Sequence, residues 1–237
     1  MHISNRLIST RVCLLAVLIG ACATSPPPRV VFEDPLTVVR LQIDTRAFPE
    51  HSHPAQITAG EMVTVLKGMK VLSRRGGVIA NIIVGADQGE PAFLAHEVFA
   101  LAPALSNALA EAKPNELVTF YRRFSDANTA LAVTSGGLFV QDHYLYFILA
   151  NNRNSPLDAI NINYVYDYDP INDPLQPITR NSFRASFEPG FVLVREEDHR
   201  PWPYVDPGRV LVIDLNLLAK DSQSHAPPLP PAEIVPQ

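Results

Sequence analysis

The chain has 237 residues, of which 47% are hydrophobic and 18% are charged, a balance typical of a folded globular protein. It carries 24 acidic against 19 basic side chains, a formal net charge of −5, and its arginines form no run longer than a pair. An acidic chain without a basic patch is poorly suited to phosphate backbones, so the composition excludes nucleic acid as an expected partner.

The first residues have the layout of a secretory signal. Arg6 and Arg11 precede an apolar run at residues 12–19, and no acidic residue occurs before Glu33. This run is too short to span a bilayer, which needs about 20 residues. We therefore expect the segment to direct export and then to be removed.

The four residues at the end of this segment, Ile-Gly-Ala-Cys at positions 19–22, resemble the lipobox of bacterial lipoprotein precursors. The resemblance implies that a diacylglycerol is attached to Cys22, that residues 1–21 are cleaved off, and that the new N-terminus is acylated. In that class an aspartate after the cysteine marks retention at the inner membrane. Ala23 therefore implies transport to the outer membrane. The periplasmic side and the cell surface both remain open for the domain, and we favour the periplasmic side.

A lipid anchor fits the cysteine content of the chain. Each buried CH₂ group contributes about 0.8 kcal/mol, so two or three acyl chains give durable attachment where one does not. The chain has two cysteines; Cys13 leaves with the signal and Cys22 carries lipid. The mature protein then has no free thiol, which excludes a cysteine nucleophile and a thiolate metal site.

Proline-rich segments flank the expected domain. Residues 22–34 include "SPPP" and predict a lipidated, extended tether. Residues 221–237 contain "PPLPP" and little apolar surface, which predicts a disordered tail. We expect a single globular domain between them, over residues 35–220.

The first part of this domain shows short elements of both kinds. β-branched residues predict a strand at 37–43. Thr58 and Glu61 have the spacing of a capping box and precede apolar residues at helical spacing, which predicts a helix at 59–68. The "MKVLS" segment favours a short strand. Residues 78–84 are apolar nearly throughout; helix and strand remain open there, and we favour helix.

A longer helix follows, with one apolar stripe along it. Its members recur every three or four residues: Leu94, Val98, Leu101, Leu105, Ala108 and Ala112. Lys113–Pro114 ends the pattern. Pro103 cannot donate to the carbonyl of Phe99, so we expect a kink or a break near residues 99–102.

After Pro114 the apolar period changes to two, which is typical of strands. A turn at Asp142–His143 predicts a hairpin with Val140 opposite Leu145, and Gly136–Gly137 predicts a bulge or corner. A second hairpin is expected over residues 182–196, around the turn residues 188–190. The sum predicts an α+β fold, with a helical N-terminal half packed on a mainly antiparallel β-sheet.

His51 and His53 are the closest pair of metal-ligand residues. Their spacing suits two ligands on an extended segment, but a zinc site needs one or two more, and nothing in the sequence brings His96, His143 or His199 to them. The alternative is a solvent-exposed loop before a helix. We favour that alternative and expect no metal and no other cofactor.

Three other groups of polar residues are more typical of turns and strand ends than of sites. Asp167, Asp169 and Asp173 are spaced like calcium ligands, but the glycine and glutamate of an EF-hand loop are missing. Ser135 stands before two glycines without the G-x-S-x-G pattern of a hydrolase. The segment at 196–202 contains Glu196, Glu197, Asp198, His199 and Trp202, but neighbouring residues of a strand point to opposite faces.

Two classes of function remain. The first is a non-enzymatic envelope lipoprotein, an adaptor or accessory protein. Its acylated Cys22 would bind the lipid bilayer of the outer membrane, and its domain would bind an envelope protein there. The second is a periplasmic enzyme or small-ligand binder whose site is assembled from distant residues. No catalytic residue is predicted, and the sequence leans toward the first class.

Overall fold

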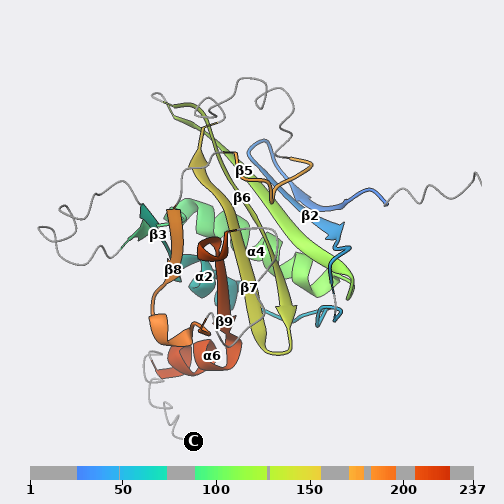
Figure 1. The fold of residues 1–237 in the computed structure, drawn as a ribbon, viewed down its shortest axis with the longest axis vertical. Coiled ribbons are helices and arrows are strands. Elements are labelled where there is room, and N and C mark those ends of the chain that lie inside the picture. The colour runs from blue at the N-terminus through green and yellow to red at the C-terminus, as the bar shows by residue number, and fades with distance from the viewer. Residues whose placement is uncertain are drawn as a thin grey trace, which may run out of the picture.

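A six-stranded antiparallel sheet forms the centre of the molecule (Figure 1). The computed structural model describes residues 26–47, 49–73, 89–126, 129–155, 171–178, 183–195 and 206–224. In spatial order the strands are β1 (Arg29–Glu33), β2 (Thr37–Ile43), β5 (Glu116–Asp126), β6 (Thr129–Gln141), β7 (Tyr144–Asn154) and β9 (Val210–Asp214). Strands that follow one another in the chain account for three of the pairings, β1–β2, β5–β6 and β6–β7.

Two helices, α2 (Ala59–Gly68) and α4 (Ala95–Glu111), cover one face of this sheet (Figure 1). The main core lies between the two layers, and its largest fully buried side chains include Leu101 and Leu105 of α4 and Phe120 and Phe147 of the sheet. A small second sheet, in the order β4 (Glu90–Pro91), β3 (Met69–Ser73), β8 (Phe183–Phe187), stands beside the helices. Helix α6 (Leu215–Ser224) follows β9 directly. Among the described residues, no helix is long and apolar enough to cross a membrane.

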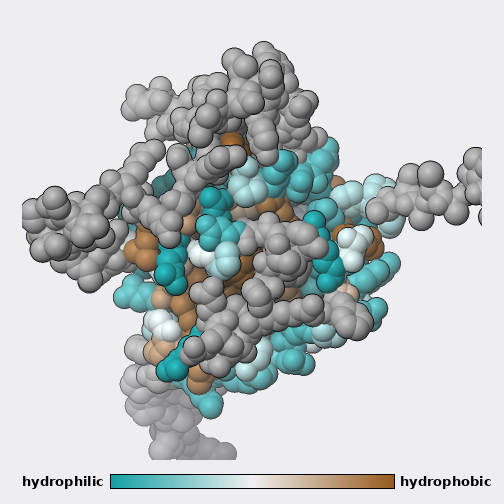
Figure 2. Space-filling view, viewed as in Figure 1, coloured by the Kyte–Doolittle hydropathy of each residue, from teal (hydrophilic) through white to brown (hydrophobic). Residues whose placement is uncertain are grey.

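The opposite face of the sheet carries a second apolar cluster. Its buried members are Leu117, Phe139, Tyr146, Ile148 and Val212. Leu175 and Val194, from segments outside the sheet, pack against them. Figure 2 views this side and shows apolar side chains over the central strands with hydrophilic ones around them. Both faces of the β6–β7 hairpin are therefore buried, as its two-sided apolar pattern predicts.

The expectation of a helical N-terminal half is wrong. Of the residues that the structure describes, 41% are in strands and 28% in helices, so sheet predominates. Strands β1 to β4 alternate with α2 and α4 in that half, so the helices form a layer without dominating it. The sheet also begins earlier than expected, because β1 lies inside the predicted tether at 22–34. Helix α6 continues to Ser224, so the boundary of the predicted tail moves as well.

Several elements lie where the sequence predicts them. Strand β2, helix α2 with its capping box, and strand β3 have the expected bounds. The β6–β7 hairpin turns at Asp142–His143 and pairs Val140 with Leu145. The predicted bulge is also present, since the register shifts next to Gly136. A Cβ atom there would come within 2.0 Å of the carbonyl oxygen of Ile148, so only glycine fits.

Two local predictions need correction. Helix α4 is continuous through Pro103, so the predicted break is absent, while the alternative of a kink stays a prediction; this proline lies on the exposed side, where the carbonyl of Phe99 can face water. The second hairpin does not form either. Residues 190–192 make a 3₁₀ turn, and β8 pairs instead with β3, more than a hundred residues earlier in the chain. The segment at 78–84 lies outside the described residues.

Candidate functional site

The two histidines predicted to lie on an exposed loop are buried. Residues 49–58 lead from β2 to α2 along the end of the sheet, and His51 and His53 are only 4% and 6% exposed. Their ring centroids lie 5.5 Å apart. His51 stacks on Phe139 of β6 at 4.2 Å, and Phe139 stacks on Tyr146 of β7 at 4.6 Å. The solvent-exposed reading of this pair is therefore wrong.

Each imidazole uses its Nε2 atom within the protein. The Nε2 atom of His51 lies 3.0 Å from Oδ2 of Asp44, a buried carboxylate. The Nε2 atom of His53 accepts a hydrogen bond from the backbone N–H of Val140 at 3.1 Å. Among the residues that the structure describes, no three His, Cys, Asp or Glu side chains are arranged to hold a metal ion. The pair is thus built into the packing of the loop.

Burial makes protonation of His53 unfavourable. It lowers the pKa of His53 from 6.5 to about 4, and the neighbouring charge of His51 lowers the pKa in the same direction. Glu116 acts to raise the pKa of His53, but burial and His51 outweigh it. At neutral pH His53 is therefore an uncharged hydrogen-bond acceptor. Burial also raises the pKa of Tyr146, so its phenol stays protonated.

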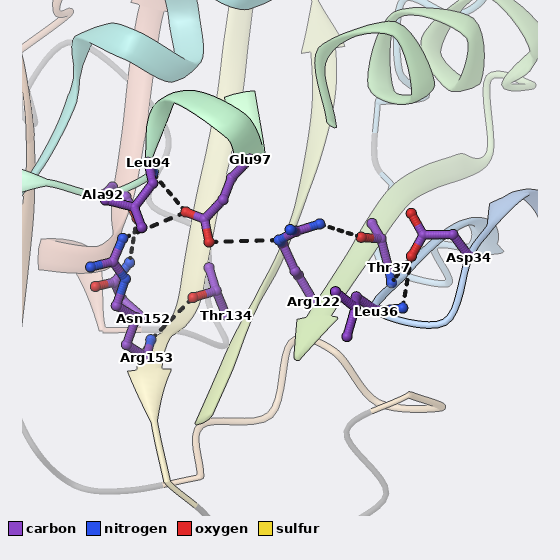
Figure 3. Close-up of polar contacts among 10 residues, drawn as sticks. All are labelled: Asp34, Leu36, Thr37, Ala92, Leu94, Glu97, Arg122, Thr134, Asn152 and Arg153. Carbon is purple, nitrogen blue, oxygen red and sulfur yellow. Dashed lines mark hydrogen bonds and ion pairs between the residues drawn. The ribbon is translucent and has the colours of Figure 1, made fainter. Parts of the chain in front are cut away.

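A second polar cluster, which the sequence analysis does not predict, lies at the N-terminus of α4 (Figure 3). Its centre is Glu97, whose side chain is fully buried. One carboxylate oxygen accepts the backbone N–H of Leu94 at 2.6 Å, as the glutamate of a capping box does. Leu94 has no side-chain acceptor to complete the box, so Glu97 alone caps this end of the helix.

Two arginines from the sheet approach the same carboxylate from either side (Figure 3). Nε of Arg122, on β5, lies 3.6 Å from Oε1 of Glu97, and Nη2 of Arg153, on β7, lies 3.5 Å from Oε2. Arg122 is buried and donates to the hydroxyl of Thr37 on β2 at 2.6 Å. The cluster therefore connects α4 to three strands, which makes it a cross-link between the two layers.

A third polar contact fixes the start of β1. The guanidinium of Arg29 donates to both carboxylate oxygens of Glu116, at 2.9 and 3.3 Å, and to the carbonyl of Glu111 at the end of α4. Glu116 is buried and also accepts the backbone N–H of Lys113. Burial acts to raise the pKa of Glu116, but the hydrogen bonds from Arg29 and the Lys113 amide, together with the charge of Arg29, outweigh it and leave this pKa below its ordinary value. We call this contact the Arg29–Glu116 clamp.

Replacing Glu116 with alanine should lower the free energy of unfolding by about 1–3 kcal/mol, because the Lys113 amide and Arg29 lose a charged partner. The folded pKa of Glu116 is lowered, so its contribution is present above the ordinary value of 4.5 and is lost as the pH falls below it. Denaturant unfolding of both proteins at pH 7 and pH 3 measures this: the difference between them should shrink at pH 3. Equal differences at both pH values would contradict the assignment.

The remaining predicted candidates lie apart from these clusters. Ser135 is buried, donates to the carbonyl of Pro174 at 2.7 Å and accepts from Asn151, so its hydroxyl holds residues 171–178 on the sheet. His96 is exposed, and His143 is a half-exposed turn residue 3.9 Å from Asp214. Asp173 lies in the described turn at 171–178.

Several candidates fall on residues that the structure does not describe. They are Cys13, Cys22, Asp167, Asp169, Glu196, Glu197, Asp198, His199 and Trp202. Comparison of the chain with protein-family models, with curated proteins and with solved structures finds no match.

Proposed function

We propose that the protein is a lipid-anchored envelope protein whose domain serves as a non-catalytic adaptor close to the outer membrane. The observation that carries this proposal is the Arg29–Glu116 clamp, which fixes the first strand of the sheet at Arg29. If Cys22 carries the lipid, seven Cα–Cα steps separate it from Arg29. An extended chain of that length spans about 25 Å at most. Such a stand-off holds the β1 edge of the sheet close to the bilayer.

The polar clusters support an adaptor more than an enzyme. A general base must present a nitrogen or oxygen to a substrate within about 3 Å. The Nε2 atoms of His51 and His53 instead contact Asp44 and the Val140 amide, and Phe139 covers the His51 ring. The Glu97 carboxylate is likewise turned onto Leu94 and two arginines. These groups are used as internal cross-links.

The anchor is tested by labelling with palmitate and by fractionation of cells. The wild-type protein should incorporate the label and sediment with membranes, and Cys22→Ser should lose both properties because it has no acceptor for the diacylglycerol. Cys13→Ser is the matched control, since that cysteine leaves with the signal, and it should behave as wild type. Label and sedimentation that persist in Cys22→Ser would overturn the lipoprotein assignment.

The adaptor role is tested by photocross-linking in intact cells. Val30 on β1 is 50% exposed, so a photoreactive residue there reaches a partner at the membrane-proximal edge. One discrete protein adduct is expected, and the Cys22→Ser background should abolish it. Phe191 is 60% exposed on a different element and serves as a comparison position. A protein that forms no adduct from either position would argue against an adaptor.

A further inference from the structure

We propose that residues 49–58 form an acid-released clasp, in which protonation of His53 detaches this loop from the end of strand β6. The proposal concerns the domain itself and does not depend on the anchor or on the adaptor role. It is argued from the hydrogen bonds that hold the loop and from the ring nitrogen that makes one of them.

The loop continues the sheet where β5 stops. The pairing of β5 with β6 ends at Val118 opposite Leu138, and two residues further along β6 the loop takes the place of β5. Val140 uses both of its backbone groups toward the loop: its carbonyl accepts the N–H of Ser52 at 2.8 Å, and its N–H donates to Nε2 of His53 at 3.1 Å. The imidazole thus substitutes for a backbone carbonyl in the ladder.

This use of Nε2 requires a neutral ring. The lone pair of Nε2 receives the Val140 N–H, so the ring proton is on Nδ1. A second proton would have to occupy Nε2, where it would point at another N–H group. Because His53 is only 6% exposed, water cannot replace the lost bond while the loop stays docked. Protonation of the ring therefore favours the released loop.

The charged groups around His53 do not offset this cost. From the loop, His51 lies 5.5 Å away and is held by Asp44. From the start of β5 comes Glu116, whose carboxylate is already paired with Arg29, and Lys113 precedes it. From β7 comes Tyr146, with its raised pKa, and Asp142 lies in the hairpin turn, where its N–H donates to Ser52. The two buried carboxylates among these neighbours, Asp44 and Glu116, are therefore already engaged by His51 and Arg29.

Release would uncover an aromatic surface. His51 leaves its stack on Phe139 when the loop detaches, and Phe139 stacks in turn on Tyr146. The loop also loses the bond from the N–H of Ala55 to the carbonyl of Leu109 near the end of α4. The clasp therefore controls both an apolar face of the β6–β7 hairpin and the contact between the sheet end and α4.

Amide hydrogen exchange on the mature chain at pH 7 and pH 4.5 tests the clasp. The pKa of His53 is about 4 in the docked loop and near 6.5 in the released loop. The equilibrium constant for loop opening should therefore increase about 50-fold when the pH falls from 7 to 4.5. After correction for intrinsic exchange rates, the amides of Ser52 and Val140 should show that increase. The amide of Leu105, inside α4, should not follow them, which distinguishes release of the loop from global unfolding.

Two histidine variants make the test specific. In His53→Gln the side-chain oxygen can accept the Val140 N–H but does not titrate, so the increase at acid pH should disappear. His143→Gln, at the half-exposed turn, is the matched control and should keep it. If the loop of His53→Gln does not dock, the ¹⁵N chemical shifts of the wild-type His53 ring provide the test. Nε2 should become protonated over the same pH range in which the exchange of the Val140 amide increases. Exchange that does not depend on pH, or that depends on it equally in His53→Gln, would overturn the proposal.

Discussion

Replacing Glu97 with alanine is expected to lower the free energy of unfolding by about 3–5 kcal/mol, because it leaves a buried arginine without its counter-charge. Glu97 is 0% exposed and Arg122 is 6% exposed, so water cannot reach the orphaned guanidinium without disturbing the core. The same change removes the acceptor for the Leu94 amide and so uncaps α4. Equilibrium unfolding in urea, followed by circular dichroism, measures the loss.

Helix α2 provides a control that separates capping from charge burial. Glu61 occupies the same third position there and accepts the backbone N–H of Thr58 at 2.8 Å, but its bonds lie at the exposed surface. Glu61→Ala should therefore cost only about 0.5–2 kcal/mol, the usual value of a cap. In the double variant Glu97→Ala with Arg122→Ala the loss should be smaller than the sum of the two single losses, since no lone charge remains. Additive losses would mean that the two side chains do not interact.

The parts of the fold that the sequence predicts correctly are those that depend on neighbours in the chain. The Thr58–Glu61 capping box defines α2 within a few residues, and the Asp142–His143 turn fixes the register of β6 on β7. The errors come from long-range pairing. Strand β8 has a turn after it that suits a hairpin, but it pairs with β3, and no local pattern encodes that choice. The helical N-terminal half is wrong for a different reason, because β1 lies in the proline-rich segment predicted to be a tether and pairs there with β2.

The polar clusters were likewise predictable from the sequence only where they depend on neighbouring residues. The spacing of His51 and His53 identifies the right pair, but their burial depends on Phe139 and Val140, which arrive from a strand almost ninety residues later. Glu97 stands in the first turn of a predicted helix, where an acidic residue usually faces solvent and favours the helix dipole. Its spacing from Leu94 is that of a capping box without the Ser or Thr. Without a Ser or Thr hydroxyl at position 94, the capping-box pattern that would have identified Glu97 is incomplete.

The buried stripe of α4 carries the second large effect. Leu101 and Leu105 are fully buried between α4 and the sheet, so Leu101→Ala and Leu105→Ala should each lower the free energy of unfolding by about 2–5 kcal/mol. The lost side chain leaves a cavity that neighbours such as Phe120 fill only in part, because they belong to a sheet anchored on both faces. Thermal unfolding should show a clearly lower midpoint for each variant.

Two positions on the same helix are the controls. Phe99 is larger than leucine but 61% exposed, so Phe99→Ala removes more atoms yet should change the free energy of unfolding by about 0.5 kcal/mol or less. Glu111 is exposed at the end of the helix and its hydrogen bond to Arg29 comes from the backbone carbonyl, which alanine keeps, so Glu111→Ala should also have little effect. This contrast separates burial from side-chain size, because both explanations predict a loss at Leu101 but only size predicts one at Phe99. Similar small losses at all four positions would show that α4 does not pack on the sheet through this stripe.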